Sequence, residues 1–169
     1  MSRTFLTVVA LLGMTTGPLA AQTGPTHIDN LRRMSLCELD RLFEGGAVGA
    51  LPTGFVRGRV LYMADARFPY ARASIASSAW KGKHFDEKGD FVNQWPGFQA
   101  LHGGSETGVS WHDGKPCHVL SYPAGTPLFG NTRDEVREIA PGLYLARLYS
   151  TCPCPRFRGY FAIQTCCPR

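Results

Sequence analysis

The chain has 169 residues, with 18 Lys and Arg against 13 Asp and Glu, which gives a formal net charge of +5. A chain of this length forms one domain with room for a hydrophobic core. The basic residues are scattered and form no block of five or more, so the charge does not support a nucleic-acid-binding function.

The first 21 residues have the pattern of a removable secretory signal peptide. Arg3 is the only charge in this stretch, an apolar run follows at 5–12, and the small residues Ala20 and Ala21 suit a cleavage site. The apolar run is shorter than the roughly 20 residues that a membrane span needs, and no later segment reaches that length. We therefore expect the mature chain to begin near Gln22.

These features predict a secreted or periplasmic protein without a transmembrane segment. Residues 22–169 form its single domain, and no repeats or low-complexity tracts divide them. The sequence does not indicate an oligomeric state.

The cysteines agree with export, because their number is even and all of them lie in the predicted domain. They are Cys37, Cys117, Cys152, Cys154, Cys166 and Cys167. We expect one or two bridges from the Cys152–Cys154 pair to the Cys166–Cys167 pair, which would staple the last hairpin. By elimination, Cys37 and Cys117 are left to pair with each other. Four thiolates also suit zinc, but their spacing differs from the usual two-residue knuckle, so no metal site is predicted.

In chain order, the first element of the domain is a short amphipathic helix. Ser35 and Glu38 form a capping-box pattern at its start, and Gly45 and Gly46 end it. Its apolar residues recur at helical spacing. They are Leu36, Leu39, Leu42 and Phe43.

After this helix, frequent glycines and prolines divide the chain into short runs rich in Val, Tyr, Phe and Trp, which are typical of strands in an antiparallel sandwich or barrel. The predicted strands are Phe55–Met63, Ala71–Trp80, Cys117–Tyr122, Leu143–Ser150 and Gly159–Thr165. Residues 133–139 are ambiguous because they alternate poorly, although Pro141 and Gly142 after them indicate a tight turn between two strands.

Four segments carry a resemblance to a known family. They are Gly54-Phe55-Val56-Arg57-Gly58, Trp80-Lys81-Gly82-Lys83-His84-Phe85, Trp111-His112-Asp113-Gly114-Lys115-Pro116 and Arg133-Asp134-Glu135-Val136-Arg137-Glu138-Ile139. In this order the chain resembles the small lipocalin-like (calycin) barrels, in particular the GXWXG-type domains of unknown function. The resemblance covers about Leu36 to Gln164, with Val56 in place of the central aromatic residue of that pattern. It implies a mainly β, antiparallel lipocalin-like barrel with a short N-terminal helix.

A barrel of about eight strands holds its own side chains or one small ligand. We expect Trp80, Tyr122 and Tyr144 to line such a cavity. We also expect one cation inside it, to bind a carboxylate or phosphate group. The candidates for this cation are Arg57, Arg133 and Arg137. The resulting hypothesis is an exported barrel that binds a small hydrophobic or amphipathic molecule and needs no cofactor.

Two alternatives remain open. One is a non-catalytic structural or protein-interaction domain whose barrel is filled by its own side chains. The other is a hydrolase or isomerase that uses the region from Ser110 to His118. That region supplies the residue types of a triad in Ser110, His112 and Asp113, but such close neighbours do not easily align in a relay. Cys117 and His118, as adjacent strand residues, point to opposite faces. An enzyme is therefore the less favoured interpretation.

Overall fold

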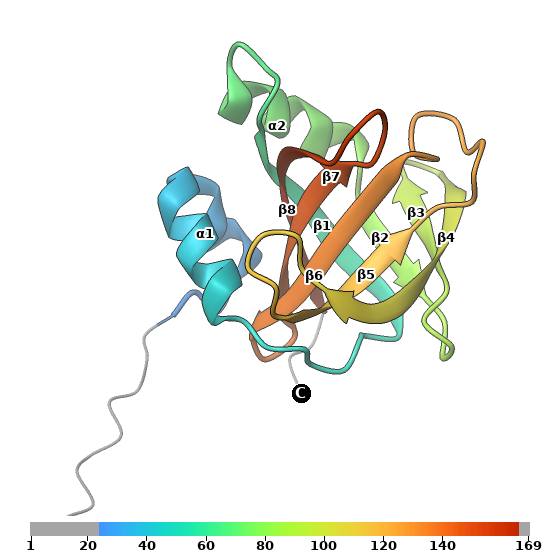
Figure 1. Cartoon of the computed structure of the whole chain (residues 1–169), viewed down its shortest axis with the longest axis horizontal. Helices are drawn as coiled ribbons and strands as arrows, with labels where there is room; N and C mark the ends of the chain where they lie inside the picture. The colour runs from blue at the N-terminus through green and yellow to red at the C-terminus, as the bar shows by residue number, and fades with distance from the viewer. Residues whose placement is uncertain (1–23, 166–169) are drawn as a thin grey trace, which may run out of the picture.

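The computed structural model of the chain describes residues 24–165. In this part of the chain, eight antiparallel strands close into one barrel, and three short helices lie against it (Figure 1). The helices are η1 (Ile28–Arg33), α1 (Leu36–Gly45) and α2 (Pro69–Ala79). The strands are β1 (Gly54–Met63), β2 (Gly82–Phe85), β3 (Phe91–Trp95), β4 (Phe98–Val109), β5 (Pro116–Ser121), β6 (Thr132–Ala140), β7 (Leu143–Ser150) and β8 (Arg156–Thr165). This confirms the predicted mainly β, antiparallel barrel with a short N-terminal helix.

The strands form an up-and-down meander in which each strand pairs with the next along the chain. β1 and β8 then pair with each other and close the barrel, for example where Gly58 lies opposite Ile163. Side chains along each strand point alternately inward and outward. The sheet therefore separates an inner core from an outer one.

The inner core is built mainly from aromatic and β-branched residues, and includes Val56, Phe91, Leu120, Val136 and Phe161. The outer core lies where η1 and α1 pack on the outside of β7, β8 and β1. It includes Ile28, Leu31, Leu39, Phe43, Leu143, Leu145 and Tyr160. Both helices thus cover the barrel from outside and leave its interior to the strands (Figure 1).

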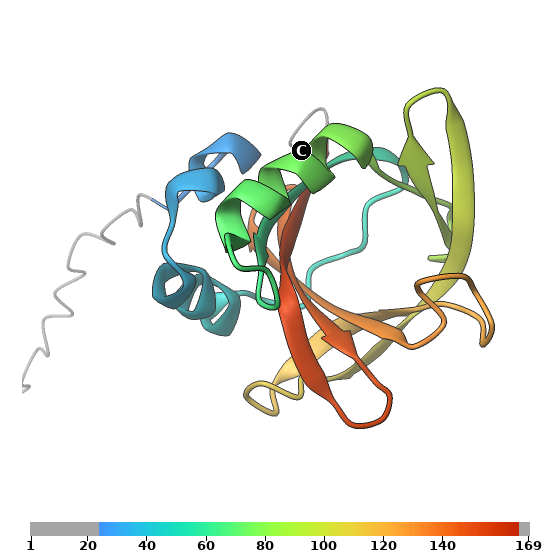
Figure 2. The ribbon, with the colours of Figure 1, turned by 90° about the horizontal axis from the view of Figure 1, so that it is seen from above.

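The two ends of the barrel differ. Helix α2 lies along the rim of one end, whereas the segment 46–53 between α1 and β1 crosses the other end (Figure 2). Backbone bonds between Ala47 and Glu138 fix this segment to β6. Inside the barrel, the Tyr144 hydroxyl donates to the carbonyl of Ala50 at 2.7 Å, and His118 Nε2 lies 2.6 Å from the carbonyl oxygen of Gly49. These contacts close the end of the barrel opposite α2.

The predicted N-terminal helix is confirmed as α1. The Ser35 hydroxyl accepts from the backbone N–H of Glu38, and the Glu38 carboxylate accepts from the backbone N–H of Ser35 at 2.7 Å. Leu39 and Phe43 are fully buried against the barrel. The capping box and the apolar spacing therefore identified both the start and the buried face of this helix.

The prediction of a strand at Ala71–Trp80 is wrong, because these residues belong almost entirely to helix α2. Pro69 stands at the first turn of this helix, where its fixed φ suits the helical conformation. Four alanines follow within the helix, and alanine has the highest helix propensity. Ser77 joins α2 to the barrel, since its hydroxyl accepts from the backbone N–H of Val60 at 2.8 Å and donates to the carbonyl of the same residue at 3.0 Å.

The other predicted strands correspond to β1, β5, β7 and β8, and the ambiguous residues 133–139 lie in β6. Sequence analysis did not identify β2, β3 and β4. β4 contains Gly103 and Gly104 in its interior, and glycine there weakens a strand signal. β2 and β3 are short, and each carries a polar residue on its buried face, namely Lys83 and Asn93.

The structure contradicts the predicted Cys37–Cys117 disulfide, because both residues are free thiols. Cys37 is exposed on α1, whereas Cys117 is buried in β5. Elimination among six cysteines took no account of this separation, and a disulfide needs Cα atoms within about 7 Å.

The predicted staple of the last hairpin involves Cys166 and Cys167, which lie outside the described residues. Cys152 and Cys154 are exposed in the β7–β8 turn and do not bond to another described cysteine. The predicted staple therefore stays a prediction.

Gly58 explains how β1 and β2 pack around an inward-facing tryptophan. A Cβ atom at Gly58 would lie 2.5 Å from the Trp80 ring and 2.6 Å from Cα of Gly82. Trp80 therefore lies directly on the backbone of β1, where a larger residue does not fit. Its ring also packs edge-on against Phe161 of β8, with ring centres 5.3 Å apart.

We predict that Gly58→Ala lowers the free energy of unfolding by about 1–3 kcal/mol, because the added methyl group overpacks the Trp80 site. Urea unfolding followed by tryptophan fluorescence measures this change. The control is Gly45→Ala at the exposed end of α1, where no atom lies within 4 Å of the added Cβ. The control should be as stable as the natural protein or slightly more stable. Equal stability of Gly58→Ala and the natural protein would contradict the packing described.

Candidate functional site

A cavity of about 240 Å³ lies inside the barrel at the end that carries α2. Its apolar walls include Trp80, Trp95, Phe129 and Phe161. Its polar residues are Lys83 and Asp134 together with Asn93 and Tyr122. The site therefore combines a mostly aromatic wall with one compact polar group.

Strand register brings the polar residues together. Lys83 on β2 lies directly opposite Asn93 on β3, so their side chains share the inner face of the sheet. Tyr122 follows the last residue of β5, and Asp134 lies on β6, two residues from the inward-facing Val136. Asp134 reaches this group from across the barrel interior, since β6 is not a neighbour of β2 or β3.

Asn93 joins the polar residues to the wall. Its Oδ1 accepts hydrogen bonds from Trp80 Nε1 at 2.9 Å and from Lys83 Nζ at 3.1 Å. Its Nδ2 donates to the Tyr122 hydroxyl and to the carbonyl of Leu101, both at 3.0 Å. All four hydrogen bonds that an asparagine amide can make are thus formed.

The bond from Asn93 to Leu101 depends on a β-bulge. Val92 pairs with His102 and Asn93 pairs with Ala100, which leaves Leu101 without a cross-strand partner residue. Leu101 has a φ of 66°, which is unfavourable for a residue with a branched side chain. This strained residue turns its carbonyl toward Asn93, directly beside the cavity.

Lys83 is 1% exposed, and its Nζ atom is surrounded by polar and aromatic groups. Nζ donates to the Tyr122 hydroxyl at 2.8 Å and lies 3.6 Å from Oδ2 of Asp134. It also lies 4.1 Å from the ring centre of Phe91 and 5.7 Å from that of Phe161, distances typical of cation–π contacts. The cation that the sequence analysis sought inside the barrel is therefore this lysine.

Asp134 is 2% exposed, and only one of its two oxygens faces Lys83. Within residues 24–165, its Oδ1 atom has no hydrogen-bond partner although it is buried. Trp95 Nε1, which belongs to another cavity-lining residue, is likewise buried and unpartnered within this range. Such atoms are rare in folded proteins, because an unpaired buried polar group is costly. Two residues that line the cavity thus each carry a buried polar atom without a partner, an acceptor on Asp134 and a donor on Trp95.

Burial shifts the protonation of the charged pair. It lowers the pKa of Lys83 to about 8, with the nearby Asp134 carboxylate opposing that change. Burial also raises the pKa of Asp134 to about 6, with Lys83 opposing it. The pKa of Tyr122 rises well above 10 for the same reason, so its hydroxyl stays protonated. At neutral pH, Lys83 and Asp134 form an ion pair, and each titrates close to that pH.

Two of the residues predicted to line a cavity, Trp80 and Tyr122, do so. Tyr144 also points into the barrel, but it lies at the end closed by segment 46–53 and bonds to Ala50 there. Its position contributes to closing the barrel and does not place it on the cavity wall.

The structure contradicts the expectation that an arginine lies inside the barrel. Arg57 is exposed on the outside of β1 and pairs with Asp29 at 3.2 Å. Arg133, also on the outer face, pairs with the buried Glu135 at 3.0 Å, and its guanidinium lies over the Trp111 ring. The alternation along each strand determines these placements.

Arg137 is buried, but it is buried outside the barrel between α1 and the β4–β5 loop. Its guanidinium forms two bonds of 2.7 Å with Asp113 and donates to the carbonyls of Phe43, Lys115 and Pro116 at 3.0 Å each. All five of its N–H donors are used within the fold. Arg137 therefore holds α1 against the sheet and has no donor left for a ligand.

Sequence analysis missed Lys83 and Asp134 because charged residues are normally exposed. One signal was present in residues 133–139. Asp134 and Val136 are two residues apart and so lie on the same face of a strand, which means that a strand that buries this valine also turns Asp134 inward. Ile139, on the opposite face of the strand, obscured the pattern because it packs against the outer core.

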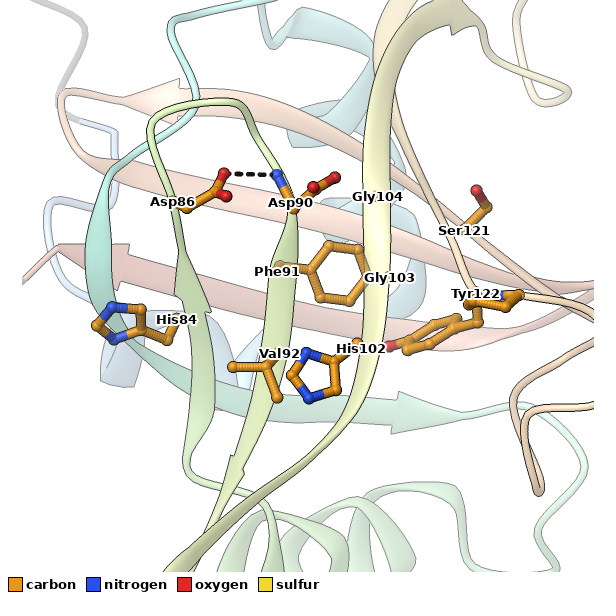
Figure 3. A pocket seen from close by; sticks show the side chains of 11 residues that line it. His84, Asp86, Asp90, Phe91, Val92, His102, Gly103, Gly104, Ser121 and Tyr122 are labelled. Carbon is orange, nitrogen blue, oxygen red and sulfur yellow. Dashed lines mark hydrogen bonds between the residues drawn. The ribbon is translucent and has the colours of Figure 1, made fainter.

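A wider hollow of about 560 Å³ lies on the surface of β2, β3 and β4. His84, Val92 and His102 stand side by side on its three neighbouring strands (Figure 3). Val92 lies between the two histidines, and neither belongs to a group of three or more metal-ligating side chains within residues 24–165. The carboxylate of Asp86 accepts from the backbone N–H groups of Lys88 and Asp90, so it stabilises the β2–β3 turn. The cavity inside the barrel has the more specific chemistry.

The residues of the Ser110–His118 region face different partners. The Ser110 hydroxyl donates to Glu135 at 2.6 Å, His112 Nε2 lies 2.8 Å from Glu44, and Asp113 binds Arg137. No relay connects them in the described structure. Burial raises the pKa of the Cys117 thiol to about 11, which disfavours the reactive thiolate.

No group of three or more His, Cys, Asp or Glu side chains within residues 24–165 is placed to hold a metal ion. No helix in the same range is both long and apolar enough to cross a membrane.

Comparison with known proteins supports the fold alone. No family model and no curated protein matches the chain. A solved structure, the crystal structure of a protein from Thermomonospora curvata, is similar with a TM-score of 0.56 and 14% sequence identity. The alignment covers 81% of this chain and 91% of that protein. The lipocalin-like resemblance is thus supported at the level of a closed antiparallel barrel.

We predict that the ion pair reduces stability most between pH 6 and pH 8. Asp134 has a pKa of about 6 in the folded state, whereas an unfolded aspartate has a pKa near 4. The folded state therefore binds more protons between about pH 4 and pH 6, and stability falls as pH rises through that range. The pKa of folded Lys83 is about 8, below its unfolded value, so stability recovers as pH rises above 8.

The double variant Lys83→Met/Asp134→Leu removes both groups and restores apolar packing. Its free energy of unfolding should exceed that of the natural protein by about 1–3 kcal/mol at pH 7. This excess should be smaller at pH 4. Urea unfolding at both pH values measures it, and an excess that does not change with pH would contradict the assignment.

Proposed function

We propose that this protein binds a small, mostly apolar molecule inside the barrel and recognises one polar group of that molecule with Asp134 and Trp95. The observation that carries this proposal is a pair of buried, unpartnered polar atoms, Asp134 Oδ1 and Trp95 Nε1, that belong to two residues lining an aromatic cavity. A hydroxyl group both donates and accepts, so it matches the two unused atoms.

The size and lining of the cavity limit the ligand. A volume of about 240 Å³ is just below the usual range for small-molecule sites of about 300–1,000 Å³, which favours a compact ligand of one ring or a short chain. The aromatic walls favour an apolar body, whose burial contributes about 25 cal/mol per Å². A packed barrel would leave neither this volume nor the unpaired atoms, so the filled-barrel alternative has less support.

The surroundings of the cavity indicate where a ligand enters. Its lining includes Ala76 and Ala79 of α2 and Phe129 of the β5–β6 loop, all at the end of the barrel opposite segment 46–53. Leu128, next to Phe129, is 97% exposed and has a φ of 66°. We place the mouth of the cavity between α2 and this loop, where an exposed apolar residue meets an apolar ligand first.

We also propose that the chain is exported, on the basis of residues 1–21, which lie outside the described residues. When the chain is expressed with its full N-terminus in a bacterium that has a periplasm, the protein should be recovered from the periplasm. Its mass should be that of a chain that begins near Gln22. A full-length product that stays in the cytoplasm would contradict the proposal.

The first test of binding is native purification of the natural protein, extraction with organic solvent and mass spectrometry of the extract. A uniform compound in stoichiometric amount would support the proposal and identify the ligand class. The same extraction from the double variant Lys83→Met/Asp134→Leu should yield less of that compound, because the polar group of the ligand can no longer form a hydrogen bond with Asp134.

A defined ligand pair tests the role of Asp134 directly. We predict that 3-phenylpropanol binds about tenfold more tightly than its methyl ether, because the ether cannot donate a hydrogen bond to Asp134 Oδ1. The double variant Lys83→Met/Asp134→Leu should lose this preference. Isothermal titration calorimetry measures the dissociation constants.

The matched control for this experiment is Arg57→Gln, on the exposed outer face of β1. It should keep both the affinity and the preference of the natural protein. Equal affinity of the natural protein for alcohol and ether, or a preference that survives in the double variant, would count against recognition by Asp134.

A further inference from the structure

We propose that Lys83 forms a covalent imine with an aldehyde held in the cavity, and that Asp134 is the counter-ion of the protonated imine. This inference rests on the proposed function, because the aldehyde must first occupy the same cavity. It names the ligand class as a small apolar aldehyde.

The position of Lys83 favours this reaction. Its Nζ atom is on the cavity wall, fixed by the Tyr122 hydroxyl at 2.8 Å and by Asn93 Oδ1 at 3.1 Å. Aromatic rings lie near it, with the Phe91 centre at 4.1 Å and the Phe161 centre at 5.7 Å. An aldehyde whose apolar body lies on the aromatic wall of the cavity brings its carbonyl carbon toward a buried amine whose position is fixed.

The chain contains four lysines, and Lys83 differs from the other three in burial. Lys81, Lys88 and Lys115 are all exposed. Burial lowers the pKa of Lys83 to about 8, so about half of this residue is the nucleophilic amine at that pH.

The reaction balances without an oxidant or reductant. The neutral Lys83 amine attacks the aldehyde carbon, a C–N bond forms, and a proton moves from nitrogen to oxygen to give a carbinolamine. Loss of the hydroxyl group with one added proton then releases water and leaves a protonated imine. The net change is one ammonium and one aldehyde to one protonated imine and one water.

Asp134 is placed to assist this sequence. Its Oδ2 atom is 3.6 Å from Nζ, so its negative charge lies beside the nitrogen that becomes the iminium. Asp134 also lines the cavity, and its Oδ1 atom has no hydrogen-bond partner within residues 24–165. With a pKa of about 6, this carboxyl group both accepts and donates a proton near neutral pH, as dehydration of a carbinolamine requires.

Reductive trapping tests the proposal. The natural protein is incubated at pH 7 with propanal, hexanal or 3-phenylpropanal, and sodium cyanoborohydride converts any imine into a stable secondary amine. Peptide mapping by mass spectrometry then compares modification of Lys83 with that of Lys81. We expect at least about tenfold faster modification of Lys83 with one or more of the three aldehydes.

Two variants control the experiment. Lys83→Arg keeps a cation beside Asp134 but lacks a primary amine, so it should lose the fast modification. Lys81→Arg changes the exposed neighbour and should keep the fast modification of Lys83. Calorimetry with 3-phenylpropanol, which cannot form an imine, measures non-covalent binding in parallel.

The outcomes separate the two proposals. Fast, Lys83-specific trapping supports the imine. Binding of 3-phenylpropanol without preferential modification of Lys83 by any of the three aldehydes overturns the imine and leaves the proposed function standing. Failure of the alcohol to bind, with no preferential modification, overturns both.

Discussion

Two opposite charges lie 3.6 Å apart inside the barrel, almost without contact with solvent. Removing an ion pair from water costs several kcal/mol per ion, and its mutual attraction offsets this only in favourable geometry. The surrounding structure provides part of that compensation through Asn93, Tyr122 and the aromatic rings around Nζ. The positions of β2, β3 and β6 around the barrel are therefore constrained by one contact between Lys83 and Asp134.

The arginines on the outer face illustrate the opposite use of charge. Arg137 uses every donor to hold α1 and the β4–β5 loop, and Arg147 binds Asp40 of α1 together with the hydroxyls of Tyr149 and Tyr160. These contacts fix α1 to the outside of the barrel. Among the described residues, buried polar atoms without a partner occur on both faces of the sheet. Asp134 Oδ1 and Trp95 Nε1 belong to residues that line the cavity, and Arg59 Nε lies on the outer face.

Patterns that report local geometry could be read from the sequence. The capping box of Ser35 and Glu38 and the turn at Pro141 and Gly142 are found where they were expected, and four of the five predicted strands exist. The helix α2 was mistaken for a strand because its one isoleucine and terminal tryptophan outweighed its alanines in the interpretation. Local patterns thus predicted most of the fold class but not every element.

The candidate site was harder to predict, because it depends on which face of each strand is buried. Trp80 and Tyr122 were found by residue type alone, since large aromatic residues are usually inside. Lys83 and Asp134 belong to strands separated along the chain, and only closure of the barrel brings them together. Arginine was the more obvious residue type for a cation that binds a ligand. However, side chains alternate between the two faces of a strand, and this alternation places Arg57 and Arg133 on the outside of the barrel.

The meander also bears on how the molecule folds. Seven of the strand pairings join neighbours along the chain, and only the β1–β8 pairing, such as Gly58 with Ile163, joins distant residues. Closing so long a loop has a large entropic cost, and non-local pairings of this kind are slow to form. Until β1 meets β8, both faces of the sheet are open to water, and the two charges remain hydrated. We expect closure to be the late step that dehydrates them, so that a partly folded chain has strands and hairpins but no binding site.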